Sequence, residues 1–111
     1  MAFKSIEAVA VGTTATQLSS GGSPYQTPAG KIDILIGFQL SNRSNTTITV
    51  DAYLKRGGNN IYLVRGAILV AGGAEDVVGG KQIMQAGDQL WVVSSVAGSL
   101  DAWASFMQDT A

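Results

Sequence analysis

Side chains able to carry out chemistry are scarce in this chain. It contains neither Cys nor His, which excludes thiolate and imidazole metal sites, disulfides, and nucleophiles activated by histidine. Glu75 and Asp76 are adjacent carboxylates, but neighbours on a strand point to opposite faces, so the pair cannot flank one glycosidic bond. No Asp-x-Asp/Asn-x-Asp run presents alternating oxygen ligands for calcium. We therefore expect no catalytic residues, no cofactor and no metal.

The glycine-rich stretch from Gly72 to Lys81 invites comparison with a phosphate-binding loop. Such a loop needs a glycine five residues before its Gly-Lys pair and Ser or Thr after it, whereas Glu75 and Gln82 occupy those places. No helix is predicted to follow and offer its N-terminal amides to a phosphate. The glycines therefore indicate turns between short strands.

Aromatic and arginine side chains are better candidates for function, because Trp, Tyr and Arg dominate the hot spots of protein–protein interfaces. Most of the large aromatics alternate with the aliphatic positions of their strands. They therefore either anchor an interface or cap the second side of a sandwich. A sugar-binding platform is a third interpretation, which we disfavour because few polar side chains accompany the rings. The interface candidates are Phe3, Tyr25, Arg43, Tyr53, Arg56, Tyr62, Trp91 and Trp103.

Charge is low and unevenly distributed along the chain. Charged residues make up 14% of the sequence, against about 25% in typical proteins. The net charge of −1 argues against binding to nucleic acid or to a membrane surface. Cations prevail between Ser41 and Arg65, whereas carboxylates prevail from Gly66 onward. A basic end and an acidic end would suit docking between subunits, and the neutral remainder would suit contact with another protein.

Length and composition predict one domain over residues 1–111, with residues 1–26 as an arm or edge segment. A chain of 111 residues can bury one core without disulfides or metals. The residues from Met1 to Glu7 contain no basic segment followed by an apolar core, so we expect no secretory signal. No stretch approaches the ~20 apolar residues that a membrane helix requires.

The residues from Lys31 to Arg65 organise the predicted fold. A polar turn ends a first alternating strand at Ser41, the alternation resumes up to Leu54, and Ile61–Val64 returns after a glycine-rich turn. We therefore predict a three-stranded meander. Its first strand has large apolar residues at every second position, the period expected when one side is buried. These positions are Ile32, Ile34, Ile36, Phe38 and Leu40.

Short apolar runs separated by turn residues continue on both sides of this meander. Phe3–Val11 is predicted as an edge strand, and Gln89–Val96 and Leu100–Met107 are predicted to form a hairpin at the end of the chain. No window keeps helical periodicity over three turns, and strands recur about every 8–12 residues. The predicted fold class is all-β: an antiparallel β-sandwich, jelly-roll-like or Greek-key, of about eight short strands.

One specific arrangement of turns and strands extends from Thr27 to Gln108. The segment Thr27-Pro28-Ala29-Gly30-Lys31 precedes a long Ile-rich strand, a Thr-rich strand ends in Tyr53-Leu54-Lys55-Arg56-Gly57-Gly58, and Ala86-Gly87-Asp88-Gln89-Leu90-Trp91-Val92-Val93-Ser94-Ser95 precedes a last strand at Asp101–Met107. This layout resembles small virion structural proteins of tailed bacteriophages. It is most similar to the capsid decoration proteins, also called cement or staple proteins, of short-tailed double-stranded-DNA phages.

The resemblance implies a non-enzymatic subunit that is made in the host cytoplasm and lies on the capsid exterior of the virion, across the seams between major capsid proteins. Its expected partners are the major capsid protein and further copies of itself, as a dimer or trimer, with no nucleic acid and no membrane. Many modest contacts on a closed lattice would reinforce one another, and an exposed edge such as Phe3–Val11 would pair with a partner's sheet. A tail, neck or baseplate protein is the nearest alternative. A carbohydrate-binding module that uses Trp91 or Trp103 is the alternative from another class.

Overall fold

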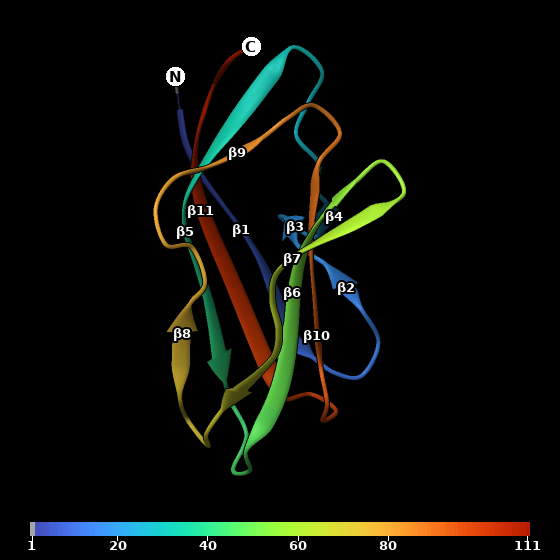
Figure 1. Cartoon of the computed structure of the whole chain (residues 1–111), viewed down its shortest axis with the longest axis vertical. Helices are drawn as coiled ribbons and strands as arrows, with labels where there is room; N and C mark the ends of the chain where they lie inside the picture. Colours follow the sequence, from blue (N-terminus) through green and yellow to red (C-terminus); the bar gives the residue numbers. More distant parts are fainter. Residues whose placement is uncertain (1) are drawn as a thin grey trace.

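The computed structural model describes residues 2–111, and Met1 lies outside them. These residues form eleven strands in two stacked antiparallel sheets (Figure 1), which confirms the predicted all-β sandwich. The number exceeds about eight because the segment after β1 forms three strands of only two residues each. The strands are β1 (Ala2–Val11), β2 (Thr16–Gln17), β3 (Ser19–Ser20), β4 (Ser23–Pro24), β5 (Lys31–Asn42), β6 (Ile48–Arg56), β7 (Asn59–Leu69), β8 (Ala74–Asp76), β9 (Gln82–Met84), β10 (Gln89–Ser94) and β11 (Leu100–Thr110).

The two sheets differ in which parts of the chain they combine. Sheet A has the strand order β4-β3-β1-β11-β5-β8, with β9 also paired to β5, and sheet B has the order β2-β10-β6-β7. The predicted hairpin between β6 and β7 is confirmed. The predicted pairing of β5 with β6 is wrong, and so is the predicted terminal hairpin of β10 with β11, because each connection crosses from one sheet to the other. Alternation specifies which side of a strand is buried, but not which sheet the strand joins.

The first and last long strands lie next to each other in sheet A. β11 pairs with β1 on one side and with β5 on the other, so β1 begins and β11 ends at the same end of the molecule (Figure 1). The other side of β1 pairs with β3 only at Glu7 and Ser19. The half of β1 from Ala2 to Ile6 therefore has a free edge.

A β-bulge in β5 changes which side chains are buried along that strand. Opposite Ser105 and Phe106 of β11 stand Gly37 and Leu35, so Ile36 is an extra residue without a partner. Before the bulge the odd positions face the core, and after it the even positions do. The prediction that Ile32, Ile34 and Ile36 line the core with Phe38 and Leu40 is therefore wrong for the first three: Ile36 is exposed, the other two are half-buried, and Asp33 and Leu35 are buried instead.

β7 also contains irregular pairing. It continues without a break past Val64, through Gly66 to Leu69. Two shifts of register with β6 accompany this continuation. The backbone N–H of Gly66, which has a φ of 67°, donates a hydrogen bond of 2.7 Å to Asp51 Oδ1. Glycine adopts this left-handed conformation without strain, so β7 continues past Gly66 as one strand.

The core lies between the sheets and contains aliphatic side chains from nearly every long strand together with Phe38 and Phe106. Asn42, which is buried at the end of β5, ties the end of β7 to the turn after β5. Its side-chain amide donates to the carbonyls of Thr46, Leu69 and Val70 at 2.7–3.1 Å, and its oxygen accepts from the backbone N–H of Ser44. The Asn42 side chain therefore acts in turn structure.

Candidate interaction surfaces

The side chains that hydrolytic chemistry would need do not converge in the described part of the chain. Glu75 and Asp76 are both exposed on β8, and no group of three or more potential metal ligands occurs within residues 2–111. A shallow cavity of about 270 Å³ opens between the end of β7 and the start of β8. Among its lining residues, only Glu75 is titratable. We therefore looked for function in the outer faces of the two sheets.

The two arginines among the interface candidates are bound within the chain. Arg56 makes a bidentate contact with Asp88, with Nε at 3.0 Å from Oδ1 and Nη2 at 2.6 Å from Oδ2. Hydrogen bonding to Asp88 raises the pKa of Arg56. Arg43 pairs with Asp101 at 3.2 Å, and both of these side chains are exposed to a similar degree. The predicted basic and acidic ends of the molecule are therefore partly neutralised by each other.

Tyr25 is a third candidate with a role inside the fold. Its hydroxyl donates to Asp33 Oδ2 at 2.6 Å, and its ring lies 5.3 Å from that of Phe106. Thr27 Oγ1 donates to the same oxygen at 2.7 Å, while Gln108 Nε2 donates to Oδ1 at 3.0 Å. Burial, then the hydrogen bond and charge of Asp33, raise the pKa of Tyr25 well above its ordinary value. This network fastens the loop before β5 to β5 and β11.

Three more candidates form one aromatic row on the outer face of sheet B. Tyr53 lies between Tyr62 of β7 and Trp91 of β10, with ring centroids 5.3 and 6.5 Å away. Lys55 Nζ lies 5.1 Å from the centroid of the Trp91 ring, and the Arg65 guanidinium lies 4.9 Å from that of Tyr62. Tyr53 is buried by its neighbours, and that burial raises its pKa. The rings of this row therefore contact one another and cations of the same sheet, as expected of cross-strand packing.

Phe3 and Trp103, the remaining candidates, lie on the outer face of sheet A, which we define as the side chains of that sheet that point away from sheet B. Directly paired residues of antiparallel strands share a face, with Cβ atoms about 4.5–5.5 Å apart. The pairing places two rows across the face. The apolar row consists of Phe3, Met107, Ile34 and Ile83, and the tryptophan row consists of Glu7, Trp103, Gln39 and Asp76.

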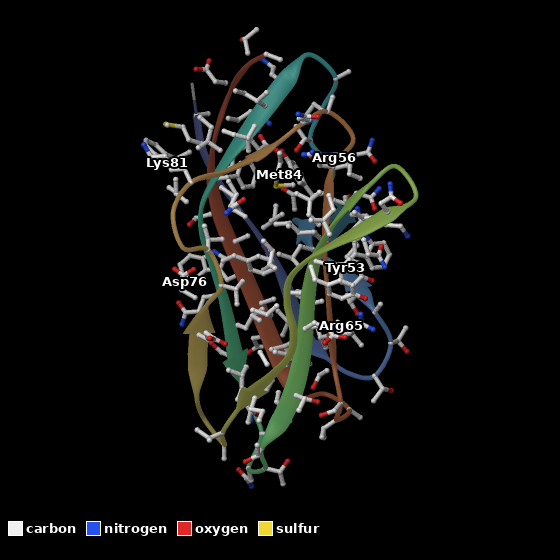
Figure 2. The ribbon with its side chains drawn as sticks, in the orientation of Figure 1. Tyr53, Arg56, Arg65, Asp76, Lys81 and Met84 are labelled. Carbon is white, nitrogen blue, oxygen red and sulfur yellow. The ribbon has the colours of Figure 1, made fainter. Side chains whose placement is uncertain are left out.

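Both rows are open to solvent. Phe3 is 78% exposed, Trp103 59% and Ile83 48%. Between the rows, Ser5, Ser105 and Gly37 are paired across the same strands and have small or no side chains. Figure 2 shows Asp76 at the far side of the molecule from Tyr53 and Arg65, so the two outer faces point in opposite directions. The outer face of sheet A thus carries large apolar side chains that the rest of the described chain leaves uncovered.

Sequence reasoning identified Phe3 and Trp103 but missed their neighbours in the two rows. Glu7 and Met107 become neighbours of Trp103 and Phe3 only through the pairing of β1 with β11. Ile34 was placed in the core, because its alternation hid the bulge at Ile36. Period-two alternation was the available signal for outward positions. It could not show which distant strands pair and so which outward residues become neighbours.

The fold and these surfaces define an all-β sandwich whose two outer faces differ: sheet B carries a packed aromatic row, and sheet A carries the exposed side chains of Phe3 and Trp103. A scan of the chain against protein-family models gives no match, and a search of curated proteins gives none either. Across residues 2–111 there is no helix long and apolar enough to cross a membrane.

Proposed function

We propose that this chain is a non-enzymatic capsid decoration protein, which clamps adjacent major capsid protein subunits and stabilises the shell of a tailed phage. The observation that carries the proposal is the outer face of sheet A, where large apolar side chains stand exposed on a rigid sheet. Phe3 and Trp103 are both more than half exposed there. Exposed apolar patches on a soluble domain mark interaction sites, and a clamp needs adhesion rather than chemistry.

A subunit of this kind acts through many copies. Each contact is modest, but copies bound side by side on a closed lattice reinforce one another through multivalency. The resemblance in the order of turns and strands supports a capsid partner and a dimer or trimer of the chain itself. In this proposal the subunit lies on the exterior of the capsid.

Heating shells of the phage that encodes the chain tests the proposal. Shells stripped of the protein are compared with the same shells after it is added back, both empty and filled with DNA. We expect the added protein to raise the temperature at which the shells rupture. An equal rupture temperature in all preparations would count against a clamp. A tail, neck or baseplate location is distinguished by cryo-images of particles that carry a labelled copy.

A carbohydrate-binding module is the second candidate, and one observation favours it. Trp103 is an exposed indole flanked by Glu7 and Gln39 in one row, and sugars stack on aromatic rings between polar partners. Trp91 is less suited, because Lys55 lies over its ring. Glycan-array binding that disappears in Trp103→Ala and persists in Trp91→Phe would support this candidate over the capsid clamp.

A further inference from the structure

We propose that the outer face of sheet A docks against a basic segment of a partner protein, and that an arginine of this segment stacks on the indole of Trp103. The inference deepens the proposed function by giving the chemistry of the partner, and it rests on that function where the partner is a capsid subunit. Two observations carry it: the uncovered ring of Trp103 and the sign of the charge around it.

The chain places cations over two aromatic rings on the outer face of sheet B. Lys55 lies over Trp91 and the Arg65 guanidinium over Tyr62. No such cation lies over Trp103 within residues 2–111, although tryptophan is the aromatic ring that binds cations best. The indole of Trp103 is 59% exposed. A guanidinium from outside the chain can therefore approach it without displacing any residue.

The charge around Trp103 is negative. Outward positions of the sheet A strands carry four carboxylates, and within residues 2–111 only Asp101 among them has a cation partner, which is Arg43. Lys4 and Lys31 pair with Phe106 and Thr110, which places them at positions of the opposite face, and Lys81 lies in the loop before β9. The four carboxylates are Glu7, Asp76, Asp101 and Asp109. Glu7 and Asp76 belong to the tryptophan row, whereas Asp109 lies six residues from Trp103 along β11, or about 20 Å.

This charge selects the occupant. A second copy that docked with the same face would bring carboxylates against carboxylates, and like charges across an interface are strongly unfavourable. The phosphates of nucleic acids or anionic lipids would be repelled for the same reason. A basic protein segment is attracted by the charge and also gains apolar contact, because the apolar row lies on the same face about four residues along β11.

The neighbours of Trp103 fit arginine better than lysine. Glu7 and Gln39 stand on either side of the indole, each one strand away, or about 4.8 Å. A guanidinium is planar and has five N–H donors, so it can lie flat on the ring while it donates to the Glu7 carboxylate and the Gln39 oxygen. The ammonium group of lysine is not planar and has three donors, so it stacks on the ring less well and cannot match both hydrogen bonds at the same time.

Selection of a displayed library of random peptides on the full chain tests the inference. We expect enriched peptides to contain arginine next to apolar residues. Affinity for a synthetic copy of an enriched peptide should fall roughly 30-fold in Trp103→Ala, the loss typical of a hot spot. It should fall about three- to tenfold in Glu7→Gln and weaken as NaCl is added, because the contact is charged and near the surface.

Two variants serve as matched controls and should bind the same peptide as the wild type does. Ile68→Ala removes an apolar side chain that is 69% exposed on β7 of sheet B. Glu75→Gln removes an exposed carboxylate adjacent in sequence to Asp76 but paired with the buried Leu40, so that it lies off the tryptophan row. Urea unfolding of each variant verifies that it is folded.

Three results would overturn the inference: no enriched peptides, enriched peptides without a basic residue, or binding that survives Trp103→Ala. Heated shells separate this inference from the proposed function. If the wild type protects the shells and both Trp103→Ala and Glu7→Gln protect them equally, the docking chemistry is wrong and the clamp stands. If enriched peptides bind at Trp103 but the wild type protects no shell, the clamp is wrong and the docking chemistry stands.

Discussion

At the scale of single residues, the two ion pairs within residues 2–111 differ in burial and so in their contribution to stability. The Asp88 side chain is 1% exposed, whereas Asp101 is 42% exposed. Asp88 also accepts a hydrogen bond of 2.7 Å from the backbone N–H of Gln85, so this carboxylate organises the turn before β10. A buried carboxylate that loses its cation keeps the cost of its desolvation, but an exposed one is rehydrated.

We therefore predict that Arg56→Ala lowers the free energy of unfolding by about 2–4 kcal/mol, somewhat less than the loss of about 3–5 kcal/mol for a fully buried pair, because the Arg56 side chain is 40% exposed. Arg43→Ala should lower it by less than about 1 kcal/mol, as exposed pairs do. Urea unfolding of the two variants measures both. Equal losses would mean that burial of Asp88 does not decide the strength of its pair.

Tyr25 gives the fold a dependence on alkaline pH. Burial and the contact with Asp33 raise the pKa of Tyr25 in the folded protein, and burial raises that of Tyr53 as well. A phenol whose pKa is raised on folding holds its proton more tightly in the native state. Its contribution to stability is therefore complete below the unfolded value of about 10 and is lost as pH rises through the folded value.

We predict that the free energy of unfolding is level up to about pH 9 and falls above pH 10. Tyr25→Phe should be less stable at neutral pH by about 1–2 kcal/mol, because Asp33 loses a donor. The same variant should show a shallower fall above pH 10, because one of the two shifted phenols is gone. Urea unfolding at a series of pH values measures both effects. Parallel curves for wild type and Tyr25→Phe would contradict the assignment.

At the scale of the element, β5 shows what alternation can and cannot predict. The period of two correctly located β5, β6, β10 and β11 as strands with one buried side. It misassigned the first half of β5, because the extra residue Ile36 inverts the pattern without leaving a mark in a run of aliphatic residues. The alternation also could not predict the pairing of β1 with β11, because strands at opposite ends of the chain carry no local signal for each other.

The bulge leads to a prediction that opposes the sequence pattern. Leu35→Ala should lower the free energy of unfolding by about 2–4 kcal/mol, because Leu35 is 1% exposed and its loss leaves a cavity. Ile36→Ala should cost less than about 1 kcal/mol, because Ile36 is 42% exposed. Urea unfolding ranks the two. A larger loss for Ile36→Ala would place the bulge elsewhere.

A second bulge lies in β1, where Ala10 has a φ of 53° and its N–H donates to Asp101 Oδ1 at 2.9 Å. Alanine is strained in this left-handed region and glycine is not. Ala10→Gly should therefore raise the free energy of unfolding by up to about 1 kcal/mol. Ala8→Gly is the control in regular strand geometry, and it should lower the same quantity by a similar amount. Thermal unfolding compares them.

At the scale of the whole molecule, the two outer faces have different roles. Sheet B places cations from its own strands over Trp91 and Tyr62, although Ile68 on the same sheet stays exposed. Sheet A leaves Phe3 and Trp103 open and carries an excess of carboxylates. The intrachain ion pairs remove much of the charge separation along the chain that the sequence indicates. The charge difference that remains is between the outer faces of the two sheets. It could be recognised only once the pairing of distant strands was known.

The position of β11 makes the fold depend on its last strand. β11 lies between β1 and β5 and contributes Leu100, Ala102, Ala104 and Phe106 to the core, each at most 2% exposed. Removing residues 100–111 would leave β1 without its principal partner and expose the hydrogen-bonding edge of β5. We therefore predict that the fragment 1–99 is unfolded by circular dichroism and that a peptide of residues 100–111 restores the sheet signal in trans. A folded fragment 1–99 would show that sheet B and β5 suffice for a stable core, and would contradict the claim that the fold depends on β11.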